Sequence, residues 1–296
     1  NPTTLSLAAV LMLVGFGYKI SAVPFHFWTP DVYEGAPITI TAFLSVASKA
    51  AGFAMLMRVL RVMMSDSSVL GLPAGVWMLL KGLNVQHILI ALSILTMTVG
   101  NLVAVWQNNV KRLLAYSSIA HAGYMLLGLV VLGNDGYAAT MIYFVMYLLM
   151  NLGAFYVVML VANATGSEEM DTYKGLGKRA PLVSVAMAVF LVSLTGLPPT
   201  AGFIGKLYIF AGLIRSGMIT LAIIGVLNSV ISLYYYVRVF RNIFLKESEG
   251  ETTPLVFPFM QHVVLLLLLI PTLVLGLYFG SVVEFAQYSV TMFGVK

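Results

Sequence analysis

The chain has 296 residues, of which 60% are hydrophobic and only 9% charged, and this balance excludes a soluble globular enzyme. Its net charge of +5 gathers in short connections between apolar runs, which indicates membrane topology and lipid contact rather than binding of nucleic acid. There is no Cys, so disulfides, thiolate-ligated iron–sulfur clusters and thiolate zinc sites are excluded within this chain.

Eight apolar runs predict an all-α fold, a polytopic membrane helix bundle. The first run starts almost at Asn1, without the basic region and cleavage site of a signal peptide, so we expect a fragment. The expected crossings lie at about 3–28, 37–64, 85–106, 112–132, 137–162, 181–217, 218–245 and 259–290.

Lys and Arg residues divide unequally between the two expected sides of the membrane, and the richer side is expected to be cytoplasmic. One side collects eight of them: Lys111, Arg112, Lys174, Lys178, Arg179, Arg238, Arg241 and Lys246. The other side holds five: Arg58, Arg61, Lys81, Arg215 and Lys296.

The first crossing carries two titratable residues beside a proline. Lys19 and His26 are seven residues apart, which is two turns on one face if the helix continued, and Pro24 frees backbone groups between them. Ionisable groups inside a membrane usually serve a function, so both are candidate proton carriers. The alternative is that Lys19 reaches the headgroups with its long stem and that His26 is an interface residue near Trp28.

Lys49 lies near the middle of the second run, which carries no other charge from Gly35 to Met57. It is too deep to reach either headgroup layer easily, and Ser45 lies one helical turn before it. Desolvation disfavours the charged form of a buried amine, which brings loss and gain of a proton within reach. We therefore predict that Lys49 carries protons.

The sixth run is interrupted at its middle by Thr195–Lys206, TGLPPTAGFIGK. Pro198 and Pro199 remove backbone donors, and the glycines add backbone freedom, so the helix should break inside the membrane. Unwound backbone at that depth is tolerated only where protein buries it or water reaches it. Lys206 lies beside the break, where an ammonium group costs about 3 kcal/mol. We predict a polar cavity there, with Lys206 as a second proton carrier.

The fourth crossing has a polar stripe with spacings of 4, 3 and 4 residues, made by Ser117, His121, Tyr124 and Gly128. His titrates nearest to neutral pH, so His121 is a candidate relay, with an interhelical hydrogen bond as the alternative. Lys111 and Arg112 open this helix and are expected to mark its cytoplasmic end. Lys111 is also a candidate for the start or end of the relay.

Other polar residues in the runs have weaker patterns. Those of the seventh crossing could line water, but we favour packing; they are Asn228, Ser229, Ser232 and the run Tyr234 to Tyr236. His87, His262 and Glu284 are expected at membrane interfaces. The sequence has no phosphate-binding loop, no paired-His metal spacing and no haem-ligand pair, so we expect charge movement rather than redox chemistry or hydrolysis.

An internal repeat is visible at an offset of 180 residues. Met57–Arg61, MRVLR, ends the second crossing, and Val237–Arg241, VRVFR, ends the seventh. In each case proline interrupts the crossing before it. The two units lie five crossings apart, so they should run in opposite directions. Inverted repeats with discontinuous, Pro/Gly-broken helices are typical of secondary transporters, and their breaks mark the transport site.

Four motifs carry a resemblance to a known family: KISAVPFHFWTPDVYEGAP at 19–37, FLSVASKAAGF at 43–53, KRLLAYSSIAHAGY at 111–124 and LPPTAGFIGKLYIF at 197–210. With them the chain resembles the antiporter-like subunit N family (subunit 2 type) of respiratory complex I, the proton-translocating NADH-quinone oxidoreductase. The resemblance implies a non-redox, proton-pumping subunit of this enzyme in a bacterial inner membrane. NAD, FMN, iron–sulfur clusters and quinone are then expected in partner subunits. Neighbouring antiporter-like subunits and lipid are the expected partners.

The resemblance also assigns residues and repeats. Lys19 matches the family's lysine in the first broken helix, Lys49 the lysine on the next helix, Lys206 that of the second broken helix, and His121 a polar relay position. The family's glutamate partner of the first lysine would lie ahead of this chain, because Asp31 and Glu34 are expected in a loop. Residues 1–84 are expected to end the first antiporter-like repeat with two crossings, residues 85–245 to form the second with a break at 196–202, and residues 246–296 to add a C-terminal crossing.

Two alternatives to this function stay open. One is a subunit of a multi-subunit sodium/proton antiporter, which would exchange sodium without any quinone-linked oxidation. The other is a structural membrane scaffold that merely tolerates its lysines. The scaffold predicts that Lys49 has no polar neighbours within reach.

Overall fold

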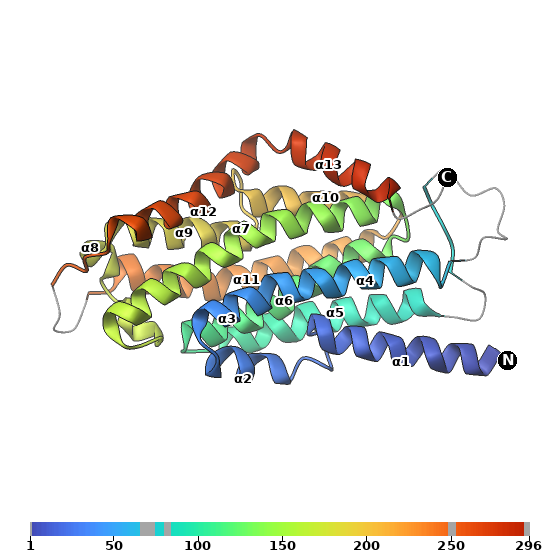
Figure 1. The fold of residues 1–296 in the computed structure, drawn as a ribbon, viewed down its shortest axis with the longest axis horizontal. Helices are drawn as coiled ribbons and strands as arrows, with labels where there is room; N and C mark the ends of the chain where they lie inside the picture. Colours follow the sequence, from blue (N-terminus) through green and yellow to red (C-terminus); the bar gives the residue numbers. More distant parts are fainter. Residues whose placement is uncertain (1, 66–74, 80–83, 248–252, 293–296) are drawn as a thin grey trace.

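The structure is a computed structural model, and it describes residues 2–65, 75–79, 84–247 and 253–292. Helices lie along one long axis and form an elongated bundle (Figure 1). Six helices in these ranges are long and apolar enough to cross a membrane. The predicted class, an all-α polytopic membrane protein, is therefore confirmed. The elements are α1 (Pro2–Ile20), α2 (Trp28–Gly35), α3 (Ile38–Phe43), the π-helix η1 (Leu44–Ser48), α4 (Lys49–Val62), α5 (Val85–Val105), α6 (Val110–Val130), α7 (Asn134–Thr165), the 3-10 helix η2 (Met170–Tyr173), α8 (Leu176–Arg179), α9 (Pro181–Thr195), α10 (Ala201–Arg215), α11 (Ile219–Leu245), α12 (Phe259–Leu277) and α13 (Gly280–Thr291).

The first crossing is a broken helix made of α1 and α2, and it extends further than the expected end near residue 28. Asp31 and Glu34, expected in a loop, lie on α2, so that expectation is wrong. Pro30 is compatible with the first turn of a helix, because no intrahelical bond needs its missing donor there. The helix ends before Pro37, where Ala36 is extended, as the residue before a proline prefers.

The second broken helix consists of α9 and α10, with the break at 196–200 inside the predicted 196–202. Gly196 ends α9 in the left-handed conformation, at φ 88°, which glycine adopts without steric cost. Gly202 lies in the first turn of α10 rather than in the break. The two half-helices therefore place a helix C-terminus, with its free carbonyl groups, in the interior of the bundle.

Helix α6 forms the centre of the bundle. All of its residues except Arg112 and Tyr116 are buried. A helix that is apolar on every side is expected in a core rather than at a surface, and α6 accordingly packs against α5, α7, α2 and α10. The polar residues of α6 are therefore held away from lipid on all sides.

The last crossing, expected as one run at 259–290, is divided into α12 and α13 by a break at Tyr278 and Phe279. Together the two helices follow the length of the bundle (Figure 1). Figure 1 also shows that α4 and α11, which carry the repeated MRVLR and VRVFR segments, run in opposite directions, as an inverted repeat requires.

The two ends of the bundle differ in their number of Lys and Arg residues. The start of α6, the segment with α8 and the end of α11 meet at one end, called here the basic end, which carries Lys111, Arg112, Lys178 and Arg241 (Figure 1). The turns between α6 and α7 and between α10 and α11 lie at the opposite end. Lys81 and Lys296, counted above for that opposite side, lie outside the described residues.

Candidate functional site

Lys49 is the first residue of α4 and directly follows the π-helix η1. Its side chain is only 1% exposed, and its Nζ donates hydrogen bonds to the backbone O (2.8 Å) and the Oγ (2.9 Å) of Ser118 on α6. The Nζ also lies 6.0 Å from the centre of the Tyr33 ring. Single turns of π-helix inside a longer helix are frequent at functional sites. Lys49 therefore has polar neighbours on Ser118, whereas the alternative of a structural scaffold predicted none.

Lys206 is buried in the second turn of α10, after the break, with 4% of its surface exposed. Its Nζ donates to the backbone O of Thr195 (2.7 Å) and to Ser229 Oγ (3.1 Å), and it lies 4.5 Å from the centre of the Tyr124 ring. Thr195 is the last residue of α9, where the free carbonyl groups carry partial negative charge. The break therefore supplies the acceptor that holds the ammonium group, and the aromatic face adds a cation–π contact.

His121 lies on α6 and is only 1% exposed. Its Nδ1 is 2.6 Å from the Tyr143 hydroxyl, and its Nε2 is 3.2 Å from the Tyr236 hydroxyl. The Tyr236 hydroxyl also lies 2.5 Å from Ser117 Oγ. In a neutral imidazole one nitrogen donates and the other accepts, while hydroxyl groups can do both. Each side of the ring therefore faces a group that can exchange a proton with it.

Helix α6 links the two lysines. Ser118 holds the Lys49 ammonium group, and Tyr124 contacts that of Lys206 through its ring. Ser229 Oγ, which accepts from Lys206, lies 3.4 Å from the Tyr124 hydroxyl. His121 sits between Ser118 and Tyr124 on the same helix. Helix α6 therefore brings the three basic groups together in one buried region.

Several polar atoms around Ser118 are buried without a hydrogen bond to any described residue. The hydroxyl groups of Tyr33 and Tyr147 both approach Ser118 without reaching hydrogen-bond geometry. The Tyr147 ring centre lies 5.1 Å from that of His121. Buried polar groups in proteins are nearly always satisfied by protein or by water, so these two hydroxyls stand out as polar atoms that the described residues do not satisfy.

The contacts around Lys49, His121 and Lys206 form one buried polar network, and further hydrogen bonds in it hold Tyr124 in place. The Asn101 Nδ2 donates to the Tyr124 hydroxyl (3.3 Å) and to the backbone O of Asn228 (3.1 Å), and the Tyr235 hydroxyl donates to Asn101 Oδ1 (3.0 Å). The packing favoured above for the seventh crossing therefore does not describe all of its polar residues. Ser229 contacts Lys206, and Tyr236, like Tyr235, enters the buried network. Tyr234, in contrast, is 61% exposed.

The structure does not bring Lys19 and His26 to this network. Lys19, near the end of α1, is exposed, its stem lies against Gly52, and it has no partner among the described residues. His26 is half-buried in the first break, and its Nδ1 is buried without a partner in the described part of the chain.

Lys111 is buried at the basic end of the bundle rather than in the network. Its Nζ donates to the backbone O of Glu34 (2.9 Å) and of Ala36 (2.7 Å), and it pairs with Glu168 at 3.0 Å. The neighbouring Arg112 pairs with Asp31 and Glu34 of α2. These contacts fix the end of α2 to α6, which is an anchoring arrangement.

Three site residues on α7 were absent from the sequence prediction. Tyr143, Tyr147 and Asn151 follow one another at intervals of four residues, and Asn151 Nδ2 donates to Ser45 Oγ at 2.7 Å. That spacing puts them on one face of the helix, so a polar stripe could have been found in the sequence.

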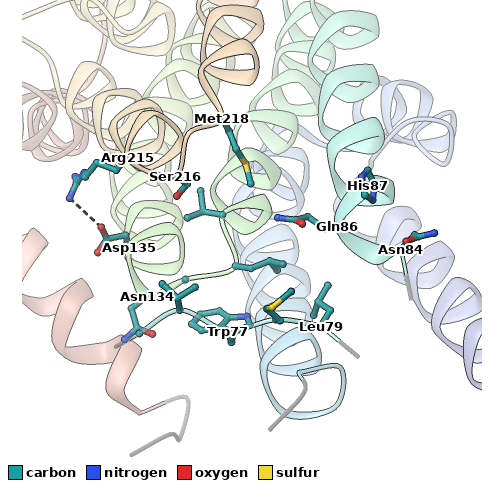
Figure 2. Close-up of a pocket in the computed structure, with 16 residues that line it drawn as sticks. Trp77, Leu79, Asn84, Gln86, His87, Asn134, Asp135, Arg215, Ser216 and Met218 are labelled. Carbon is teal, nitrogen blue, oxygen red and sulfur yellow. Dashed lines mark hydrogen bonds and ion pairs between the residues drawn. The ribbon is translucent and has the colours of Figure 1, made fainter. Parts of the chain in front are cut away.

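Cavities lie at both ends of the bundle. One of about 690 Å³ is lined by Lys111, Glu168 and Asn109 at the basic end. The other, of about 680 Å³, is shown in Figure 2; Trp77 and His87 line it, together with Asp135 and Arg215, which pair at 3.1 Å. Among the described residues no three His, Cys, Asp or Glu side chains gather as possible metal ligands.

Known proteins are similar to this chain in sequence. NADH-quinone oxidoreductase subunit N of Chlorobium chlorochromatii is 52% identical over 98% of this chain and 56% of that protein. Subunit N 2 of Sorangium cellulosum is 54% identical, with the same coverage. The chain thus spans little more than half the length of these relatives.

Solved structures give the same picture. A chain of respiratory complex I from Thermus thermophilus matches with a TM-score of 0.77 and 36% identity, over 94% of this chain and 58% of that one. A chain of the Mrp complex from Dietzia matches with a TM-score of 0.85 at 21% identity, over 98% of this chain and 59% of that one, which shows a shared fold alone. The family described as NADH:quinone oxidoreductase/Mrp antiporter, TM, matches residues 1–232. The chain therefore belongs to this family of transmembrane proteins.

Proposed function

We propose that this chain is part of a subunit N of NADH-quinone oxidoreductase and moves protons across a bacterial inner membrane. The observation that carries the proposal is the placement of Lys49 and Lys206, both under 5% exposed, on polar side chains of α6 with His121 between them. The enzyme as a whole oxidises NADH and reduces quinone, and this chain is a non-redox subunit of it. The names of the relatives at 52% and 54% identity support this choice.

The surroundings of the two lysines suit proton exchange. Within the described residues neither ammonium group has a carboxylate in ion-pair range, and their acceptors are Ser118, Thr195 O and Ser229. A buried ion pair would leave an unpaired carboxylate when the lysine lost its proton, which is costly. Neutral acceptors leave no such charge behind. Each lysine can therefore give up and regain its proton without stranding a counter-charge.

The proton path follows the contacts of α6. A proton leaves Lys49 toward Ser118 and passes through the Tyr147 hydroxyl and bridging water to His121. The ring takes a proton at one nitrogen and releases one from the other, and the groups that face these nitrogens are the hydroxyls of Tyr143 and Tyr236. In this proposal water bridges the step from there to the Tyr124 hydroxyl, and Ser229 then passes a proton to Lys206. Each hydroxyl releases one proton as it receives another, so only the lysines and the imidazole change their charge.

The ends of the path and the partners follow from the same proposal. The cavity beside Lys111 opens at the basic end, which the excess of Lys and Arg assigns to the cytoplasm, and the cavity of Figure 2 opens at the opposite end. Lys19 lies on a face that, by the resemblance, a preceding helix with a glutamate would cover. Flavin, iron–sulfur clusters and quinone belong to partner subunits, and neighbouring antiporter-like subunits complete the membrane arm.

Replacing Lys206 by Met in the assembled complex tests the proposal. We expect fewer protons moved per electron from NADH to quinone in inverted membrane vesicles, because Met cannot carry a proton. Lys178→Met is the control, since this lysine is 83% exposed at the basic end. An unchanged proton-to-electron ratio in Lys206→Met would contradict the proposal. Sodium-dependent exchange without quinone reduction would instead support the sodium/proton antiporter.

A further inference from the structure

Helix α12 faces the rest of the bundle with a narrow stripe whose side chains become smaller along the helix. The buried residues of α12 are Leu265, Leu269, Thr272 and Gly276, at spacings of 4, 3 and 4. This spacing follows one face of a helix. The face therefore leaves room for something bulky near its C-terminal end, at Gly276.

The element that takes this room is the break of the second broken helix. A methyl group at Gly276 would lie 2.7 Å from the carbonyl carbon of Pro199 and from that of Thr200, and closer still to the Pro199 oxygen. Backbone thus lies directly on the helix surface, which only a residue without a side chain permits. Figure 1 shows the junction of α12 and α13 beside the break between α9 and α10.

The position of this break decides how Lys206 is held. Its acceptor, Thr195 O, belongs to α9, while Lys206 itself belongs to α10, and the two are 2.7 Å apart. The only chain link between them runs through 196–200. A second bond across the break joins the amide of Gly202 to Ser193 Oγ at 3.0 Å. Displacing Pro199 would therefore move the acceptor relative to the ammonium group.

We propose that the C-terminal helix α12 holds this break in place by packing against its backbone, and that Gly276 is a positioning residue for proton transfer at Lys206. The effect on proton transfer rests on the proposed function, whereas the packing of the break on α12 rests on the contacts of Gly276 alone. The C-terminal crossing lies outside residues 1–232, which the family matches. In this proposal it nevertheless contributes to the site. Gly276 acts through Pro199 and Thr195 and does not touch the proton itself.

The test compares two glycines of the last crossing in the whole complex. Gly276→Ala is expected to slow NADH-driven proton translocation about tenfold, the effect of losing one hydrogen bond to a charged group. Gly280→Ala is the matched control, because nothing lies within 4 Å of an added methyl group there, and its rate should stay at the wild-type value. A wild-type rate in Gly276→Ala, or an equal loss in both variants, would overturn the inference.

Two further measurements separate positioning from general damage. In a Lys206→Met background Gly276→Ala should cause no additional loss, whereas a merely structural effect would lower the rate again. If Lys206→Met alone changes nothing, the proposed function fails, and cysteine labelling then tests separately whether the break packs on α12. Thr200→Cys, only 3% exposed under α12, should resist N-ethylmaleimide in this cysteine-free chain, and adding Gly276→Ala should raise its labelling because the break is displaced. Equal labelling with and without Gly276→Ala would refute the packing of the break on α12.

Discussion

Ser118 offers the sharpest test of how Lys49 enters the relay. Ser118→Ala removes the Oγ that lies 2.9 Å from Lys49 Nζ but leaves the backbone O, 2.8 Å away, as an acceptor. A hydrogen bond to a charged group contributes about 1.5–3 kcal/mol, and each 1.36 kcal/mol corresponds to a factor of ten. We therefore expect proton translocation to slow by about tenfold to a hundredfold, with the fold retained.

The assay is NADH-driven proton uptake into inverted vesicles, with quinone reduction measured in parallel. Ser184→Ala is the control, because Ser184 Oγ is also buried but has no partner among the described residues. Tyr147→Phe should slow translocation as well, and the double variant Ser118→Ala/Tyr147→Phe should lose less than the sum of the two, since both act on one path. Wild-type rates in Ser118→Ala, or additive losses in the double variant, would refute the reasoning.

Three other predictions follow from the site and its supports. His121→Phe keeps a ring of similar size but cannot carry a proton, so translocation measured in vesicles should be lost, and wild-type pumping in this variant would exclude His121 from the path. Gly196→Ala and Gly166→Ala both force a side chain into the left-handed region, which costs about 1–2 kcal/mol of stability. Only the methyl group at 196 would contact Lys206, 2.7 Å from its Cδ, so only Gly196→Ala should slow proton translocation. Lys111→Met leaves two carbonyls and Glu168 Oε1 without their donor, so the thermal midpoint of the complex should fall while the proton-to-electron ratio stays the same; a lowered ratio would place Lys111 in the relay.

The sequence predicted the residues whose burial is costly. Lys49 and Lys206 stood out because a charge inside a long apolar run needs a reason to be there. Pro198, Pro199 and Gly196 located the second break because their backbone chemistry is local. His121 and Ser117 followed from helical spacing. These features depend on one or two turns of chain, which a sequence displays directly.

Other parts of the fold depend on contacts between distant segments. Helix α2 looked like a loop because it is short, charged and flanked by prolines, and it is held in place by Lys111 and Arg112, more than 70 residues away. The division of the last crossing was hidden by a uniformly apolar run. The polar face of α7 was missed because the hydroxyl groups of Tyr143 and Tyr147 stand in a long, mostly apolar run, and their partners lie on other helices. The exposure of Lys19 depends on how α1 packs against α4, and the periodicity of α1 alone does not show that.

The central claim is that the two buried lysines belong to a single proton path through α6. Lys49→Met, Lys206→Met and the double variant should be compared in assembled complexes by the number of protons moved per electron. One path predicts that each single variant loses the same share of protons and that the double variant loses no more. If each single variant instead loses a part and the double variant loses the sum, the lysines serve separate paths and the account is contradicted.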